Sequence, residues 1–396
     1  MSEGLSIALL SHIASREAPT GAEHSLALLA RGLSQRGHRV TVVAPGPWAL
    51  ADSLARDGVA VATVASKPCW LAYWEPRPWP VALAKWLRYA WPPRGRRALA
   101  AWLARSRPDA VHVNCLPHLA GASAAAKAGR PVAWHVREIV PAGRRRRWLA
   151  AQLRRDARAI VAVSEAVARW LRDENLGDRL HVVPNGVESC APPPDPWRAR
   201  STFGLERERV VIGLFGQLVP HKGALSFIEA ARRALAEQRD LCFVLAGPGP
   251  AAFRRRCEQA IARGSLADSI RLLPAQPAGG ELIVASDVVC LATETPDPLP
   301  RAVLEAMAAG RPVAAFDSGG TGEMVAHGET GLLVAPGDVD GLARAFLRLG
   351  RDRALRDRLG QAGARRVRES FSFDLHVSRM EAVIAGVACG AEGRRP

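Results

Sequence analysis

Short runs of β-branched and aliphatic residues alternate with longer segments whose apolar residues recur at helical spacing. The runs of the first half predict strands over Ser6 to Leu10, Arg39 to Ala44, Val59 to Val64, Ala110 to Asn114, Pro131 to Val136, Ala159 to Val163 and Leu180 to Val183. Those of the second half predict strands over Val210 to Phe215, Leu241 to Ala246, Ile270 to Leu273, Val288 to Ala292, Val313 to Phe316 and Leu332 to Val334. Strands that alternate with helices in this way indicate an α/β fold with parallel sheets.

A proline-rich stretch separates the two series. After Glu188 the chain reads CAPPPDPWRARS and shows no hydrophobic periodicity, which is typical of an interdomain linker. We therefore predict an N-terminal domain over residues 1–188, a linker over 189–200 and a second domain over 201–370, each of the domains doubly wound and Rossmann-like. Residues 371–396 are expected to form a C-terminal helix and tail that return to the N-terminal domain. At 396 residues the chain is long enough for two hydrophobic cores.

The charge of the chain predicts an anionic partner. The net charge is +16, which favours a nucleic acid, a phosphate-bearing small molecule or an anionic membrane surface. Seven cysteines, an odd number without paired spacing, indicate reduced cytosolic thiols and no zinc site. The N-terminus lacks the pattern of a signal peptide. No uncharged run is as long as the roughly eighteen residues that a membrane-spanning helix needs. We therefore expect a cytoplasmic protein that is soluble or peripheral at the membrane.

Tryptophan and arginine are interleaved between about Lys67 and Pro108. The residues are Trp70, Trp74, Trp79, Trp86, Trp91 and Trp102 with Arg77, Lys85, Arg88, Arg94, Arg96, Arg97 and Arg105. Such a face suits the headgroup level of a membrane, and a basic run over Arg144 to Arg147 beside Trp148 favours that interpretation. The alternative of core tryptophans with solvated arginines stays open, whereas a stacking surface for nucleic acid is disfavoured.

The stretch DPLPRAVLEAMAAGRPV, from Asp297 to Val313, carries two carboxylates. Asp297 followed by proline predicts a capped helix start, and the apolar residues from Arg301 to Ala309 predict a buried helix. Glu305 in its middle needs a partner, either a ligand hydroxyl or a core arginine. The two carboxylates would be about 12 Å apart along a helix. With the positive helix N-terminus between them, they suit a ligand with a hydroxylated ring at each end and a diphosphate in the middle.

Four more positions are candidates for ligand contact because each follows or ends a predicted strand. Gly21 belongs to a turn between a strand and a helix, and Gly216 ends the first strand of the second half. Lys222, one of four lysines in the chain, precedes a long helix, where a cation and a helix N-terminus can converge on a phosphate. His135 ends a strand, the end that lines the ligand crevice in open parallel sheets, although a histidine satisfied within the core is the alternative.

An acidic pair, Asp338 and Asp340, precedes a helix. We expect these residues to cap that helix and not to bind a metal.

Taken together, the motifs resemble those of the family-4 retaining glycosyltransferases. The segments that carry the resemblance are TGAEHSLALLARGLSQRGHRVTVV, AVSEAVARWL, VVPNGVE, GQLVPHKG, VLAGPGP, LEAMAAGRPV, GGTGEMV and HGETGLLVAPGD. The resemblance implies the GT-B fold, two Rossmann-like domains that face each other across a deep cleft. It also implies a nucleotide-diphosphate sugar donor, a glycan or lipid-linked acceptor, retention at the anomeric carbon, and no metal or other cofactor.

The resemblance also implies roles for particular residues. Lys222 would contact the donor diphosphate, Glu305 the ribose hydroxyls and Asp297 the donor sugar. His135 would lie close to the reacting sugar, and Gly21 in a loop near the phosphates and the acceptor. The remaining donor-binding positions are Gly216, Gln217, Leu299 and Pro300.

Three positions depart from the family pattern. Gln217 stands where arginine is usual and removes a positive charge. Asp297 replaces a longer glutamate, and Pro300 replaces a glycine and lacks a backbone N–H. These departures put the donor-sugar contacts in question.

The sequence thus predicts a retaining hexosyltransferase of cell-surface polysaccharide or glycolipid synthesis. Two alternatives remain: a nucleotide-sugar epimerase on the same scaffold, and a catalytically weakened GT-B protein that acts as a binding subunit.

Overall fold

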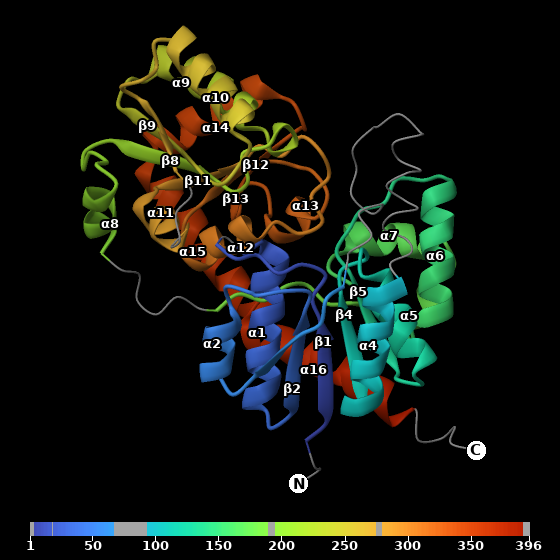
Figure 1. The fold of residues 1–396 in the computed structure, drawn as a ribbon. Helices are drawn as coiled ribbons and strands as arrows, with labels where there is room; N and C mark the ends of the chain where they lie inside the picture. The colour runs from blue at the N-terminus through green and yellow to red at the C-terminus, as the bar shows by residue number, and fades with distance from the viewer. Residues whose placement is uncertain (1–3, 18, 67–92, 189–194, 275–278, 391–396) are drawn as a thin grey trace. The chain divides into compact units, whose positions relative to one another are not determined.

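The computed structural model describes residues 4–17, 19–66, 93–188, 195–274 and 279–390 of the chain. The chain forms two compact units (Figure 1). Unit 1 comprises Met1–Gly186 together with Phe373–Pro396, and unit 2 comprises Val187–Ser372. Each unit contains one wholly parallel sheet with helices packed against it, which confirms the predicted α/β class.

The sheet of unit 1 has its first strand in the middle. Its strands are β1 (Ser6–Leu10), β2 (Arg39–Ala44), β3 (Ala60–Thr63), β4 (Ala110–Asn114), β5 (Val132–Val136), β6 (Ala159–Ala162) and β7 (Leu180–Val182). Their order is β3-β2-β1-β4-β5-β6-β7. Because β1 pairs with both β2 and β4, the direction of winding reverses between β1 and β4. A reversal of this kind is where open α/β sheets bind ligands.

The helices of unit 1 follow the strands in alternation. They are α1 (Gly21–Gln35), α2 (Ala51–Arg56), α4 (Pro93–Ser106), α5 (Leu119–Lys127), α6 (Arg144–Asp156), α7 (Glu165–Asp173), the 3-10 turn η2 (Gly177–Arg179) and α16 (Phe373–Cys389). Helix α1 begins where it does because Thr20 and Glu23 form a capping box, which satisfies N–H groups of the first turn. Its buried face carries Leu26, Leu29 and Leu33.

Helix α16 belongs to unit 1 although it lies at the far end of the chain. It packs against α1 and against β4 and β5, and it buries Val377, Met380 and Ile384 in the same core as the leucines of α1. At the edge of this contact Glu381 accepts a hydrogen bond from Arg36 at 2.6 Å and pairs with His38 at 2.8 Å. The two helices therefore share one face of the sheet, held by apolar contact and a peripheral ion pair.

The sheet of unit 2 repeats this arrangement. Its strands are β8 (Val210–Phe215), β9 (Leu241–Ala246), β10 (Ile270–Leu273), β11 (Val288–Leu291), β12 (Val313–Phe316) and β13 (Gly331–Val334), in the order β10-β9-β8-β11-β12-β13. Its helices are α8 (Pro196–Thr202), η3 (Pro220–Lys222), α9 (Ala224–Glu237), α10 (Ala251–Arg263), α11 (Gly279–Ala285), α12 (Arg301–Ala308), α13 (Thr321–Met324), α14 (Val339–Arg351) and α15 (Arg353–Ser370). Its first strand, β8, pairs with both β9 and β11.

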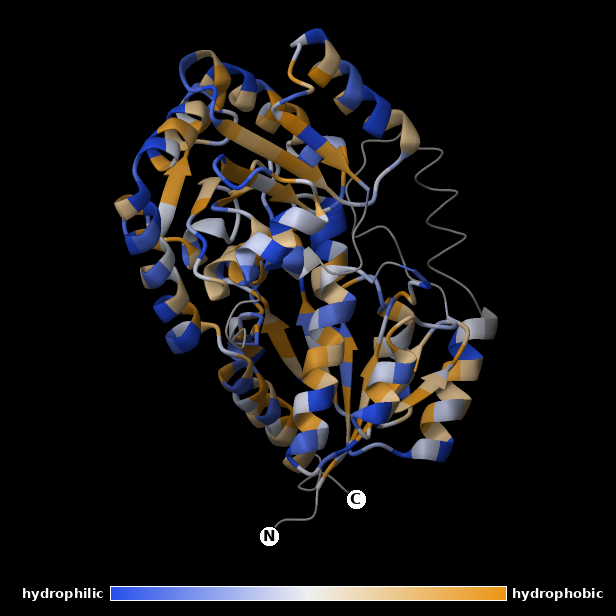
Figure 2. Cartoon of the chain, turned by 90° about the vertical axis from the view of Figure 1, so that its left-hand side faces the viewer, coloured by the Kyte–Doolittle hydropathy of each residue, from blue (hydrophilic) through white to orange (hydrophobic). Residues whose placement is uncertain are grey.

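Strand β9 shows why the predicted strands read as unbroken apolar runs. Leu241, Phe243 and Leu245 belong to the core that includes α9, α10 and α14. The intervening Cys242 and Val244 pack with Ala199 of α8 and Leu282 of α11. Because both faces of the parallel sheet are covered, every position of the strand is apolar. Figure 2 shows the strands mostly in the hydrophobic colour, whereas the helices alternate between hydrophobic and hydrophilic residues.

The observed strands lie within one residue, at each end, of the predicted ranges. The segment expected to be a linker differs in its second half, because residues 196–202 form α8. Asp195 caps this helix by accepting a hydrogen bond from the Trp197 N–H, and Pro196 occupies its first turn. Buried Arg200 donates hydrogen bonds to Ala285 O and to Asp287 Oδ2. The first half of the expected linker, residues 189–194, lies outside the described residues.

Most of the predicted segment of tryptophans and arginines, residues 67–92, also lies outside the described residues. Its last part forms α4, on which Trp102 is half-buried and Arg105 is exposed. No helix in the described part of the chain is long and apolar enough to span a membrane.

The substitution of alanine for glycine at two positions, Gly32 on α1 and Gly386 on α16, tests how closely these helices pack. A Cβ at Gly32 would lie 2.4 Å from Val377 Cγ2 and 2.9 Å from Phe373 Cζ, whereas a Cβ at Gly386 meets nothing within 4 Å. We expect Gly32→Ala to lower the free energy of unfolding by about 1–3 kcal/mol through overpacking. Gly386→Ala should leave stability unchanged or raise it by about 1 kcal/mol, because alanine is the better helix former.

Urea unfolding of both variants beside the wild type measures this difference. Equal stability of Gly32→Ala and Gly386→Ala would contradict the close approach of the two helices.

Candidate active site

The carboxyl ends of β8 and β11, which are neighbours at the reversal of winding in unit 2, bring Lys222 and Asp297 together. Lys222 ends η3, in the connection that follows β8, and Asp297 lies in the connection that follows β11. Lys222 Nζ donates a hydrogen bond to Asp297 Oδ2 at 2.5 Å. The side chain of Asp297 is 9% exposed and that of Lys222 is 29% exposed. The pair is therefore a largely desolvated ion pair that still reaches the surface through the lysine.

Two glycines allow this approach. Gly223 follows Lys222 with φ of 74°, and a Cβ there would lie 1.6 Å from Ala292 O, at the end of β11. Gly319 has φ of 63°, and a Cβ there would lie 2.1 Å from Asp297 O. Both positions require the left-handed backbone region, and neither leaves room for a Cβ beside the neighbouring carbonyl oxygen, so glycine is the residue that fits. Gly320 N–H then donates to Asp297 O at 2.8 Å, which fixes the segment that carries the carboxylate.

The sequence had predicted that Asp297 caps the helix that follows it, and this prediction is wrong. Helix α12 begins at Arg301, its N-cap residue is Pro300, and no side chain caps it. The second proline explains the difference, because a residue that precedes proline is disfavoured from the helical region, so Pro300 opposes helix at Leu299 and α12 begins only at Arg301. Asp297 is thereby released from capping and is available to Lys222.

The sequence had predicted that Glu305 is a buried carboxylate, and this prediction is wrong. Its side chain is 39% exposed and pairs at 2.9 Å with Arg301, one turn earlier on α12. The helix buries one side, with Val303, Leu304 and Met307, and leaves Glu305 on another. The carboxylate therefore needs no buried partner. It lies on the same helix whose start adjoins the Lys222–Asp297 pair.

The remaining predicted positions of unit 2 lie at the same sheet edge. Gly216 and Gln217 follow β8 directly and are exposed, whereas Leu299 is buried. His221 adjoins the pair, and partial burial and the charge of Lys222 lower its pKa, while Asp297 opposes that effect. Helix α9 begins at Ala224, so its unpaired N–H groups lie two residues beyond Lys222. A cation, a helix start and exposed backbone thus gather where a phosphate would be stabilised.

In unit 1 the predicted His135 lies on β5 and is wholly buried. Burial is the main cause that holds its pKa well below the ordinary value, followed by the charge of Arg137 and by His112 and His376. Gly21 is the first residue of α1, after the cap residue Thr20, and does not form the turn that the sequence had suggested. The loop before it is held by Glu23, a buried carboxylate that accepts hydrogen bonds from Ser15, Thr20 and Trp48.

The sequence analysis missed further buried histidines of unit 1. They are His12, His112 and His118, and burial is the main cause that lowers their pKa values, to about 3, about 3 and about 4. It also did not single out Glu138, which is buried. Burial raises the pKa of Glu138 to about 7, while its Oε2 accepts hydrogen bonds from Leu116 N and Arg137 N. The available signal was a polar residue inside an apolar strand run, as at His112 in AVHVN.

The acidic pair near residue 338 is structural, as predicted for Asp338. Its Oδ1 accepts a hydrogen bond from Gly341 N–H at the start of α14, and Asp340 pairs with Arg233. Among the described residues, no group of three or more histidine, cysteine, aspartate or glutamate side chains is arranged to hold a metal ion.

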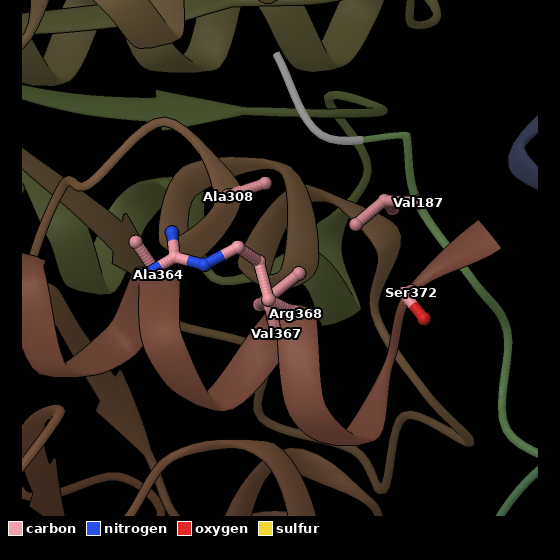
Figure 3. Close-up of a pocket in the computed structure, with 6 residues that line it drawn as sticks. All are labelled: Val187, Ala308, Ala364, Val367, Arg368 and Ser372. Atoms are coloured by element: carbon pink, nitrogen blue, oxygen red, sulfur yellow. The ribbon is translucent and has the colours of Figure 1, made fainter. Parts of the chain in front are cut away.

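A small cavity of unit 2 lies between α12 and the end of α15 (Figure 3). It is lined by Val187, Ala308, Ala364, Val367, Arg368 and Ser372, and about 20 Å³ of it is open to a water-sized sphere. That is room for a water molecule but not for a nucleotide. The cavity is separate from Lys222 and Asp297, and we assign it no part in ligand binding.

Comparison with protein-family models gives two matches. Residues 19–189 match the model described as Glycosyltransferase Family 4, and residues 209–352 match the model described as Glycosyl transferases group 1.

Three curated relatives illustrate the similarity in sequence. The 2-deoxystreptamine glucosyltransferase of Streptomyces kanamyceticus is 34% identical over 49% of this chain and 52% of the relative. The D-inositol 3-phosphate glycosyltransferase of Geodermatophilus obscurus is 32% identical over 59% of this chain and 53% of the relative. An exopolysaccharide phosphotransferase of Streptomyces coelicolor is 36% identical over 50% of this chain but over only 20% of its own length. The chain thus spans about half, or less, of the length of these relatives.

Solved structures match over almost the whole chain. HepE of Anabaena, solved in complex with UDP and glucose, has a TM-score of 0.80 at 22% identity and covers 96% of this chain and 99% of its own. Sucrose-phosphate synthase of Thermosynechococcus elongatus has a TM-score of 0.78 at 20% identity and covers 97% and 99%. These likenesses confirm the predicted GT-B fold. With matches to both family models in the expected order, the chain belongs to the family-4, group 1 glycosyltransferases.

Proposed function

We propose that this protein is a retaining hexosyltransferase that moves a sugar from a nucleotide-diphosphate donor to a glycan or lipid-linked acceptor. The acceptor belongs to cell-surface polysaccharide or glycolipid synthesis. The observation that carries the proposal is the Lys222–Asp297 pair at the reversal of winding in unit 2. HepE, which has the same fold, was solved with UDP-glucose, and a relative from Rhizobium meliloti is a lipopolysaccharide core biosynthesis glycosyltransferase.

The donor diphosphate would lie at Lys222 and the start of α9. When the bond between the sugar and the diphosphate breaks, negative charge grows on the leaving phosphate oxygen, and a fixed ammonium group stabilises that charge. Gln217 brings only an amide to this place, so Lys222 carries the larger share of the stabilisation. It is the single lysine of residues 187–372.

Asp297 would serve two states of the site. Without a donor its carboxylate pairs with the Lys222 ammonium, which keeps both charges satisfied in a largely buried place. With the diphosphate present, the ammonium has a stronger anionic partner, and the carboxylate accepts hydrogen bonds from hydroxyls of the donor sugar. Aspartate reaches one methylene less far than glutamate, so the sugar would lie closer to the main chain at Asp297.

Retention follows if the acceptor oxygen attacks the anomeric carbon on the face that the diphosphate leaves. The bond from the anomeric carbon to the diphosphate oxygen breaks, and the bond to the acceptor oxygen forms. The acceptor hydroxyl proton passes to the leaving phosphate oxygen. These bond changes need no metal ion or other cofactor. The ammonium group of Lys222 supplies the positive charge that stabilises the leaving diphosphate.

The protein would work at the inner face of the cell membrane, where lipid-linked acceptors are found. Helix α6 exposes Arg144, Arg147 and Arg154 at spacings that place them along one side of the helix. An anionic lipid surface attracts such a row of charges.

Two substitutions separate donor binding from turnover. Glu305→Ala should raise the dissociation constant of the donor about 10-fold to 100-fold, because a hydrogen bond to a charged group is lost. Lys222→Ala should lower kcat by about 100-fold to 1,000-fold, since the charge it stabilises grows as the bond breaks. Release of labelled sugar from nucleotide sugars, with and without candidate acceptors, measures both quantities.

Matched controls are available for each substitution. Glu258→Ala removes another glutamate paired with an arginine one turn earlier, on α10, and Lys127→Ala removes an exposed lysine of α5. Both should behave as the wild type. If Lys222→Ala turns over at the wild-type rate, Lys222 does not contact the donor diphosphate. Conversion of the donor to an epimer without any acceptor would favour an epimerase.

Membrane attachment is tested by flotation with liposomes. Anionic vesicles should carry the protein at low salt, and less of it at high salt because screening weakens the attraction. The double variant Arg144→Ser, Arg147→Ser should bind roughly 30-fold less, at about 1 kcal/mol for each basic residue. Arg255→Ser with Arg263→Ser, on exposed positions of α10 in unit 2, removes the same charge as a control. Equal recovery of all proteins in the unbound fraction would refute the attachment and leave the transferase proposal standing.

A further inference from the structure

The buried ring of His135 receives two close contacts on the same nitrogen. His112 Nε2 lies 3.4 Å from His135 Nδ1, and Arg137 Nη2 also lies 3.4 Å from it. The two imidazole rings meet edge to face, with centroids 5.5 Å apart and planes at 80°. The other ring nitrogen, Nε2, is buried and has no hydrogen-bond partner among the described residues. The contacts of His135 are therefore concentrated on one side of its ring.

The identity of these neighbours decides where the proton of His135 lies. A guanidinium group is always protonated and only donates hydrogen bonds. The nitrogen that faces Arg137 must then accept, so Nδ1 carries no proton. A neutral imidazole has one N–H, and that N–H is left to Nε2. His112 Nε2 faces the same accepting nitrogen and must carry a proton as well.

Arg137 cannot easily turn away from this position. Its Nε donates to Asn114 Oδ1 at 2.8 Å, and its Nη1 donates to Asn185 Oδ1 at 2.6 Å. Asn114 is the last residue of β4, the neighbour of β5 in the sheet, and Asn185 follows β7. Both amides are buried. The hydrogen bonds to these two amide oxygens thus hold the guanidinium plane, and the fold fixes the donor that His135 meets.

The surroundings also keep both histidines neutral. Burial is the main cause that lowers the pKa of His135, and Arg137 on the following loop, His112 on β4 and His376 on α16 act in the same direction. For His112 burial, Arg137 and His376 lower the pKa to about 3. His376 itself contacts Pro184 O through Nδ1 at 2.7 Å. Each of these named groups therefore opposes a positive charge on His135, and the choice between the two neutral tautomers is left to the hydrogen-bond geometry.

We propose that Arg137 is a positioning residue that holds His135 as the neutral tautomer with its proton on Nε2, and through it holds His112 with a proton on Nε2. His135 then offers a hydrogen-bond donor and cannot accept a proton from a substrate hydroxyl at that nitrogen. The tautomer follows from unit 1 alone. Only the group that would receive the N–H, a hydroxyl or phosphate oxygen of a transferase substrate, rests on the proposed function.

Long-range proton–nitrogen correlation spectra of the 15N-labelled full chain test the assignment without any substrate. The signals of each histidine are identified by their loss in His135→Gln and His112→Gln. We expect Nε2 of both rings to show the shift of a protonated ring nitrogen and Nδ1 that of an unprotonated one, unchanged from pH 8 to pH 5.5. A protonated Nδ1 of His135, or its conversion to imidazolium in this range, would overturn the proposal.

Variants at Arg137 separate positioning from folding. Arg137→Gln removes the obligate donor, so the His135 signals should move toward the average of the two tautomers, whereas Arg137→Lys keeps a cationic donor and should preserve the wild-type signals. His181→Gln, at an exposed position of β7, is the control and should change the signals of neither His135 nor His112. If Arg137→Gln folds and its His135 signals are unchanged, Arg137 does not fix the tautomer of His135 and the proposal is wrong. Because the spectra contain no nucleotide sugar, failure of the transferase proposal would leave this result intact.

Discussion

All strands of each sheet run parallel, and this constraint determines where the polar residues of the protein gather. Parallel strands place all their carboxyl ends at one edge, and the first strand of each unit lies in the middle of its sheet. The connections after β8 and β11 therefore leave from neighbouring strand ends, and so do those after β1, β4 and β5. The first set brings Lys222 to Asp297. The second brings Arg137 to Asn114 and His135.

The two edges differ in their electrostatics. In unit 2 a cation and a carboxylate pair directly, so the site keeps a lysine charge near the surface that an anionic group can recruit. In unit 1 burial suppresses charge on the histidines, and the guanidinium of Arg137 is held by neutral amide oxygens. One edge is suited to stabilise a charge that develops on a ligand, and the other to orient neutral hydrogen bonds.

The sequence predicted the strands well because covered parallel strands are apolar on both faces, as β9 illustrates. It also identified Lys222 and Asp297 as separate candidates. It could not show that they form an ion pair, because 75 residues separate them and only the pairing of β8 with β11 joins their segments. The sequence-based account of α12 failed for a local reason, since the effect of the second proline outweighed the capping signal of Asp297. The partners of His135 could not be predicted, because they come from β4, the β5 loop and α16.

The proposed function requires the Lys222 edge of unit 2 to bind a nucleoside diphosphate. Thermal unfolding of the full chain in a panel of nucleoside diphosphates tests it most directly, because a ligand that binds only the folded state raises stability by mass action. At a concentration about 100 times its dissociation constant, the correct ligand should stabilise the protein by about 2.7 kcal/mol. The account predicts that at least one nucleoside diphosphate raises the unfolding temperature of the wild type, and raises that of Lys222→Ala less. If none of them raises it, or if Lys222→Ala gains as much as the wild type, the account is contradicted.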